Sequence, residues 1–162
     1  MNLCPFAKTE LVKDRVRFAV TDAKNEVQLL TALENELALL ERDASVETTL
    51  LAHPDVLQDF DDYNQFLGDA DRLLVVMQLE GIYQIASFHP DYQFAGTEPD
   101  DAENYTNRSP YPVLHLLRED SLERAIEAYP DADQIPVRNI ALMNRMGKSK
   151  LSDLLRACFN HR

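Results

Sequence analysis

The chain has 162 residues and a mass of 18.5 kDa, which is typical of one folded domain. Its hydrophobic fraction of 45% excludes an intrinsically disordered protein, and its net charge of −12 disfavours nucleic acids and anionic membranes as partners. No apolar run approaches the roughly 20 residues of a membrane span, and no signal-peptide pattern begins the chain. We therefore expect a single cytoplasmic domain over residues 1–162.

Two strands, each followed by a helix, are predicted in the first half of the chain. Arg15–Val20 alternates charged and apolar residues as a half-buried strand does. The helix over 22–42 places on its buried face Val27, Leu30, Leu33, Leu37 and Leu40. Thr48–His53 is rich in β-branched and aliphatic residues, which favours a second strand. Helical spacing over 56–77 then predicts one long helix or two consecutive helices, with the expected break at Gly68.

Two further strands and three helices are predicted in the second half. Residues 82–88 and 113–118 have the composition of strands, and a long connection separates them. Residues 120–123 resemble a capping box at the start of a short helix, and two more helical segments follow, separated by Gly147. Cys158 falls on the apolar stripe of the last segment, so we expect its thiol in the core.

The order of these elements predicts the fold class. Helix-length connections between the first three strands favour parallel pairing, with helices packed over the sheet. We therefore predict an α/β fold, a small mixed sheet of about four strands with helices packed on it. The direction of the fourth strand is open, and an antiparallel strand would approach a ferredoxin-like arrangement.

The tripeptide His-Pro-Asp occurs twice, at His53–Asp55 and at His89–Asp91, each time directly after a predicted strand. If the two strands are parallel, both histidines lie at carboxyl ends, where open α/β sheets place their ligands. At His53, the motif is better explained as the end of a strand and the start of a helix. No helical pattern follows His89, which makes His89 the stronger candidate for chemistry.

The connection over residues 89–112 exceeds the about 12–15 residues beyond which loops without regular structure are uncommon. Its aromatic residues argue for order, and polar groups on loops held by a rigid scaffold often carry function. We expect a binding or catalytic loop, with a packed loop or a partner surface as alternatives. The ligand-binding candidates in this loop are Tyr92, Asn104, Tyr105, Asn107, Arg108 and Ser109.

Two more candidates lie outside the loop. His115 falls among aliphatic residues of the fourth predicted strand, where a hydrogen-bonded core histidine is commoner than a ligand. Cys4 could be a nucleophile if a histidine assisted its thiolate, although a structural role is commoner. A metal site built from His53, His89 and His115 is a minor alternative, because neither His-x-x-x-His nor Cys-x-x-Cys occurs.

Long stretches of the chain resemble a bacterial family catalogued as domain of unknown function 1415. They are NLCPFAK, TTLLAHPDVLQDFDDYNQFL, ASFHPDYQFAGT, DDAENYTNRSPYPVLHLLRE and VRNI, between Asn2 and Gly147. The resemblance supplies no reaction or cofactor. It implies signature positions at Cys4, Pro5, Phe6, His89, Pro90, Asp91, Tyr92, Phe94, Gly96, Asn104, Tyr105, Asn107, Arg108, Ser109, Pro110 and His115. Family members carry a further helical segment before NLCPFA, so we expect this chain to lack that helix or to begin downstream of it.

Three functional hypotheses follow. The leading one is a small-molecule-binding domain, and in its enzymatic form Cys4 is the nucleophile, His89 held by Asp91 is the acid or base, and Arg108 binds an anionic group of the ligand. The first alternative is a non-catalytic protein-interaction module that uses the Tyr- and Arg-rich loop 89–112. The second alternative is the histidine-based metal site.

Overall fold

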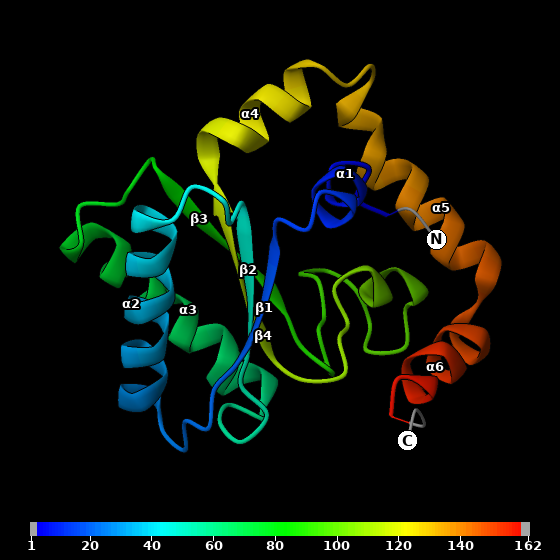
Figure 1. Cartoon of the computed structure of the whole chain (residues 1–162). Helices are drawn as coiled ribbons and strands as arrows, with labels where there is room; N and C mark the ends of the chain where they lie inside the picture. The colour runs from blue at the N-terminus through cyan, green and yellow to red at the C-terminus, as the bar shows by residue number, and fades with distance from the viewer. Residues whose placement is uncertain (1–2, 160–162) are drawn as a thin grey trace.

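The computed structural model describes residues 3–159, which fold around a four-stranded sheet (Figure 1). The strands are β1 (Val16–Val20), β2 (Thr48–Ala52), β3 (Tyr83–Phe88) and β4 (Val113–Arg118), in the order β1-β2-β4-β3. β1 and β2 are parallel, whereas β4 is antiparallel to both β2 and β3. The first three strands therefore run in one direction, and the predicted α/β fold with a mixed sheet is confirmed.

The fourth strand has the direction that the sequence left open. β4 is antiparallel and lies between β2 and β3, where Leu114 and Leu116 are fully buried. The sheet-forming elements follow the order strand-helix-strand-helix-strand-strand. A ferredoxin-like domain has the order strand-helix-strand-strand-helix-strand. The arrangement is therefore different from the ferredoxin-like alternative.

Helices α2 (Glu26–Arg42) and α3 (Phe60–Val76) cover one face of the sheet (Figure 1). The Asn25 side chain caps α2 and the Asp59 side chain caps α3, each by accepting a hydrogen bond from the first turn. The helices bury Leu29, Leu33, Leu37, Leu40, Tyr63, Phe66, Ala70 and Leu74. α3 continues through Gly68, so the predicted break is wrong. The buried residues on both sides of Gly68 outweigh its helix penalty of about 1 kcal/mol.

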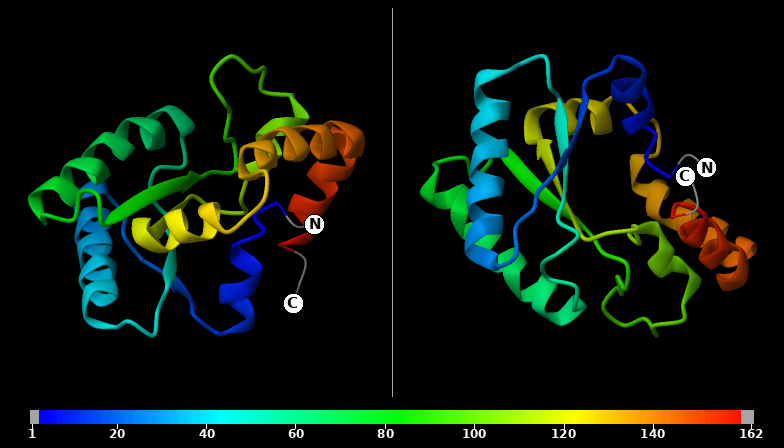
Figure 2. Two further views of the ribbon diagram at one scale, coloured as in Figure 1. Left: turned by 90° about the horizontal axis from the view of Figure 1, so that it is seen from above. Right: turned by 60° about the horizontal axis from the view of Figure 1, so that its bottom comes forward.

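The other side of the sheet faces α1 (Ala7–Val12), α5 (Ile135–Met146) and α6 (Lys148–Ala157). α5 and α6 lie beside the long loop, as Figure 2 shows from two further directions. The loop contains a 3₁₀ turn, η1 (Ala102–Thr106), and the 3₁₀ turn η2 (Ala132–Gln134) precedes α5. A second hydrophobic cluster joins η1 to these helices through the buried side chains of Ala102, Met143 and Leu151.

Two expectations about the C-terminal helices are wrong. Helix α4 (Glu119–Glu127) begins after Arg118 without a side-chain cap, so Asp120 lies inside the helix and forms no capping box. Cys158 directly follows α6 and is exposed, because the buried contact of α6 is made by Leu151.

Within residues 3–159, no helix combines the length and the apolar character needed to cross a membrane.

Candidate functional site

Two histidines lie at the carboxyl ends of β2 and β3, which run in the same direction, as the His-Pro-Asp motifs predict. His53 follows β2 and His89 follows β3, with the start of β4 between them. The His53 amide donates to the Pro112 carbonyl at 3.0 Å, and the His89 amide donates to the Asn107 carbonyl at 3.2 Å. Both imidazoles are fully buried. The Tyr63 ring contacts both, with centroids 5.7 Å from His53 and 5.1 Å from His89.

The Tyr63 hydroxyl bridges the last rung between β3 and β4. It donates to the Val113 carbonyl at 2.9 Å and accepts from the Phe88 amide at 3.1 Å. Phe88 and Val113 are directly opposite in the register of the two strands. Burial raises the pKa of Tyr63, so the hydroxyl keeps its proton. A side chain of α3 therefore completes the sheet at the end that carries the histidines.

Replacing Tyr63 with Phe is expected to lower the free energy of unfolding by about 1–3 kcal/mol, because two buried backbone groups lose their common partner. Urea unfolding measures the loss, and amide hydrogen exchange at Phe88 should become faster. The matched control is Tyr111→Phe, because the Tyr111 ring is 46% exposed. Equal stability of Tyr63→Phe and the native chain, with unchanged exchange at Phe88, would show that the strands pair directly without the hydroxyl.

Both ring nitrogens of His89 are bonded to backbone groups. Nδ1 accepts from the Asp91 amide at 3.0 Å, so the ring proton is on Nε2, which donates to the Leu57 carbonyl at 3.2 Å. Leu57 has a φ of 57°, a left-handed conformation that is unusual for a bulky side chain. Burial lowers the pKa of His89, although the Asp91 and Asp59 carboxylates oppose the shift. His89 is therefore a neutral anchor between the long loop and the β2–α3 connection.

The other two described histidines are also neutral at pH 7. His53 donates from Nδ1 to the Val56 carbonyl at 3.0 Å, and its Nε2 has no partner among residues 3–159. His115 donates from Nε2 to the Thr48 hydroxyl at 2.8 Å, because that hydroxyl gives its single proton to the Leu116 carbonyl at 2.6 Å. Burial lowers the pKa of His53 and of His115 to about 4.

Asn104 organises the interior of the long loop. Its side chain is fully buried, and Oδ1 accepts from the Phe94 amide at 3.0 Å and from the Thr97 hydroxyl at 2.9 Å. Nδ2 donates to the Glu98 carbonyl at 2.8 Å. Phe94, Thr97 and Glu98 are thus held by one amide group, and Asn104 is directed inward rather than toward a ligand.

Arg108 also bonds within the loop. Its guanidinium lies over the Tyr105 ring, 4.5 Å from the centroid, in a cation–π arrangement. Nε donates to the Tyr92 carbonyl at 3.2 Å and Nη2 donates to the Pro99 carbonyl at 2.8 Å. Arg108, Tyr105 and Tyr92 are therefore brought together, as their shared loop suggested, and their contacts stabilise the loop itself.

The remaining loop candidates fix the loop to the end of β3. Asn107 donates from Nδ2 to the Ser87 carbonyl at 3.1 Å. The Ser109 amide donates to the His89 carbonyl at 3.4 Å, and its hydroxyl donates to the Tyr111 carbonyl at 2.5 Å. These bonds hold residues 107–109 beside the strand end and explain why amide and hydroxyl side chains occur here.

Cys4 lies in a different environment from His89. Cys4 is exposed, and its neighbours contact the C-terminal part of the chain: the Leu3 carbonyl accepts from Asn139 of α5 at 2.9 Å, and the Phe6 ring meets Tyr129, which follows α4, at 5.6 Å. His89 is buried against α3 and the β2–α3 connection. No hydrogen bond joins Cys4 to His89 within residues 3–159. Asn2, the first residue of the NLCPFAK string, lies outside the described residues.

Two shallow hollows occur on the described surface, and the predicted site residues line neither. One lies beside the N-terminus of α2 and includes Lys24, but Lys24 is paired with Asp55 at 2.5 Å, and Glu26 and Asp62 also line it. The other runs between α3 and β3. Over residues 3–159, no three His, Cys, Asp or Glu side chains are arranged to hold a metal ion.

The two hydroxyl groups that connect the histidine-bearing strands, those of Tyr63 and Thr48, were not predicted from the sequence. Tyr63 appeared only as a member of an apolar helical stripe, and Thr48 only as a strand residue. A signal was available for Tyr63, because a tyrosine on the buried face of a helix needs a hydrogen-bond partner.

Comparison with known proteins identifies one family. The family described as "Protein of unknown function (DUF1415)" matches residues 1–153. No curated protein and no solved structure matches the chain. The resemblance expected from the sequence strings is therefore confirmed.

Proposed function

Since the chain belongs to the DUF1415 family, whose description names no activity, we propose from the geometry that it is a non-catalytic binding domain. Its loop 89–112 recognises a basic surface of another protein. The observation that supports this proposal most is that the buried and the exposed side chains of the loop have different roles. Its buried polar side chains hold the loop in one shape, while its carboxylates and one aromatic ring face solvent.

The small-molecule hypothesis finds less support in the positions of its residues. His89 is neutral and has both ring nitrogens bonded, so it is a poor acid or base. Arg108 stacks on Tyr105 and donates to two loop carbonyls instead of presenting a free fork to an anion. Cys4 contacts neither group. These contacts favour a structural role for His89 and Arg108 over Cys/His catalysis.

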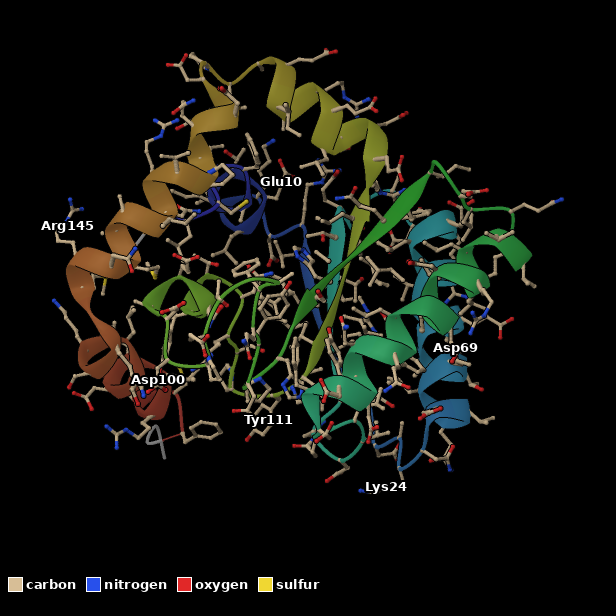
Figure 3. The ribbon with its side chains drawn as sticks, turned by 180° about the vertical axis from the view of Figure 1, so that it is seen from behind. Glu10, Lys24, Asp69, Asp100, Tyr111 and Arg145 are labelled. Atoms are coloured by element: carbon tan, nitrogen blue, oxygen red, sulfur yellow. The ribbon has the colours of Figure 1, made fainter. Side chains whose placement is uncertain are left out.

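The exposed part of the loop is acidic and includes one exposed aromatic ring, that of Tyr111. Its exposed carboxylates belong to Asp91, Glu98, Asp100 and Asp101. Tyr111 meets the exposed ring of Phe159 edge to face at 5.6 Å. Asp100 and Tyr111 both project outward from this end of the molecule (Figure 3). Tyrosine is enriched at interface hot spots, and a preformed loop loses little conformational entropy on binding.

The charge of the chain suggests the kind of partner. A net charge of −12 repels acidic proteins and steers basic ones toward the molecule. Lys148 of α6 already contacts Asp100 at 2.5 Å, which is an internal example of a cation against this loop. We therefore expect the partner to present Lys or Arg around an apolar contact for the Tyr111 ring.

Site-specific photo-cross-linking in living cells tests the proposal. The photoreactive residue p-benzoylphenylalanine replaces Tyr111 in the full chain, and the matched control replaces Val27, which is 73% exposed on α2. We expect one discrete protein adduct at position 111 and none at position 27. The adduct should be lost when Asp91→Lys and Glu98→Lys are introduced, because both carboxylates are exposed. Absence of a discrete adduct at 111, an equal adduct at 27, or an adduct that survives the charge reversal contradicts the proposal.

A further inference from the structure

β3 is an outer strand of the sheet, and its backbone groups alternate between β4 and the open edge. At the start of β3, the Glu119 amide donates to the Ile82 carbonyl at 2.9 Å, so the backbone groups of Gln84 also face β4. Ile85 comes between the positions that face β4 and directs both its N–H and its C=O outward. Residues 3–159 provide no hydrogen-bond partner for these two groups.

Two of the neighbouring outward groups are bonded within the chain itself. The Tyr83 amide donates to the Leu79 carbonyl at 3.1 Å, and the Ser87 carbonyl accepts from Asn107 at 3.1 Å. Folded proteins commonly protect edge strands with such contacts, because unpaired edges pair with other chains. The unprotected stretch is centred on Ile85, where a peptide could add as a further strand.

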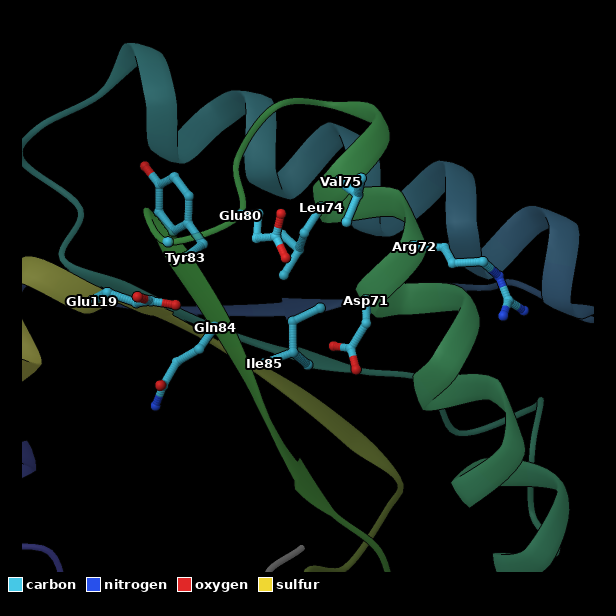
Figure 4. A pocket seen from close by; sticks show the side chains of 10 residues that line it. Asp71, Arg72, Leu74, Val75, Glu80, Tyr83, Gln84, Ile85 and Glu119 are labelled. Atoms are coloured by element: carbon cyan, nitrogen blue, oxygen red, sulfur yellow. The ribbon is translucent and has the colours of Figure 1, made fainter.

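A shallow hollow runs along this stretch, between β3 and the second half of α3 (Figure 4). Its apolar part is formed by Leu74 and Val75 of α3 and by Ile85 of β3. Val75 is 54% exposed, so this apolar surface is accessible to a partner. An added strand would lay alternate side chains on it, because successive side chains of a strand point to opposite faces.

The remaining charged side chains of the hollow give it a negative potential. Three carboxylates line it, those of Asp71, Glu80 and Glu119. The one lining cation among the described residues, Arg72, is in an ion pair with Asp69. α3 also ends here with no basic residue in its last turn, so the negative end of its dipole is uncompensated. Complementary charge therefore favours Lys or Arg in the occupant.

We propose that the open edge of β3 binds an extended segment of another protein in which Lys or Arg alternates with apolar residues. The segment adds as a fifth strand, with backbone hydrogen bonds to Ile85 and with its apolar side chains on Leu74, Val75 and Ile85. The long side chains of its Lys or Arg residues reach around the edge of the added strand toward the carboxylates of Asp71, Glu80 and Glu119. A second copy of this chain is a poorer occupant, because pairing of two identical edges would bring these carboxylates together. The edge is separate from loop 89–112, so the interaction proposed at one surface can be wrong while the interaction proposed at the other is right.

The probe is a synthetic peptide, acetyl-Lys-Val-Lys-Val-Lys-Val-amide, added to the full ¹⁵N-labelled chain. We expect the amide resonances around Ile85 to shift and the exchange of the Ile85 amide to slow. A peptide N-methylated at alternate residues keeps the charge and loses one set of N–H donors, and it should bind about fivefold or more weakly. Asp71→Lys should weaken binding about fivefold, whereas Glu34→Lys, an equal charge change at an exposed position of α2, should have a smaller effect.

Four outcomes overturn the proposal: no binding, equal binding of the N-methylated peptide, equal effects of Asp71→Lys and Glu34→Lys, or resonance shifts confined to residues 98–101. The last outcome would indicate attraction to the acidic loop alone. The readouts at Ile85 and at position 111 are independent, so failure of this proposal is distinguishable from failure of the proposed loop interaction.

Discussion

The free energy of unfolding is expected to fall by about 6 kcal/mol between pH 7 and pH 4 through His53 and His115 alone. Each imidazole has a folded pKa of about 4, below its unfolded value of 6.5, because burial disfavours the charged form. Between pH 6.5 and pH 4, the unfolded chain therefore binds more protons at these two imidazoles than the folded chain does. The contribution of each group is complete above pH 6.5 and is lost as the pH falls toward 4. His89 adds to the same loss, because its pKa is also lowered.

Urea unfolding at stepped pH values from 7 to 4 measures this effect. His115→Gln keeps a neutral side chain and removes one titrating group, so the fall in stability between pH 6.5 and 4 should become smaller by about 3 kcal/mol. Asp43 and Asp100, whose pKa values are lowered from 3.8, lose their contributions at lower pH and do not obscure this window. A stability that stays flat between pH 7 and 5 would mean that the histidines are hydrated or charged in the folded chain.

Replacing Asn104 with Ala is expected to have the second largest effect, a loss of about 3 kcal/mol in the free energy of unfolding. The change removes three hydrogen bonds at once, those to Phe94, Thr97 and Glu98. It also leaves a space in the interior of the loop, where the Asn104 side chain is fully buried. The loop should therefore become mobile as well as less stable.

Two measurements separate these effects. Chemical denaturation gives the global loss, and limited proteolysis should show new cleavage within residues 95–101 under native conditions. Asn144→Ala is the matched control, because Asn144 is exposed on α5. Native-like stability of Asn104→Ala, together with an uncleaved loop, would show that η1 and α5 fix the loop without the Asn104 amide.

The strands and the long helices follow from the sequence because their hydrophobic periods are clear. The predicted strand 82–88 begins one residue before β3, and the predicted bounds of β4 agree with the structure. The face of α2 is less well predicted, since Val27 is 73% exposed and Leu29 is buried. Leu29 and Leu30 are both apolar, so spacing alone does not decide which of them faces the sheet. The short helix α1 has no side-chain cap and buries no residue, so it gave little signal.

The positions of the histidines were predictable, but their bonding was not. The two motifs and the parallel strands place His53 and His89 at one end of the sheet, where β2 and β3 finish. Their ring partners are the carbonyls of Val56 and Leu57, which depend on a left-handed backbone at Leu57. Left-handed conformations are expected at Gly or Asn, so nothing in the residue type indicates this turn. The bonds of Asn104 were not predictable either, because its three partners are brought together only by the folded path of the loop. Asn104 was therefore predicted as a ligand-binding residue.

The insertion of β4 between β2 and β3 limits the order in which the chain can fold during synthesis. β2 and β3 are complete by residue 88, but they do not pair with each other. The sheet can close only after residues 113–118 have left the ribosome and entered the space between them. Until then, no strand pairs with the sides of β2 and β3 that face β4, and the nascent chain exposes apolar surface around Leu51 and Ile85. A nascent chain that lacks residues 113–118 therefore has an incomplete sheet.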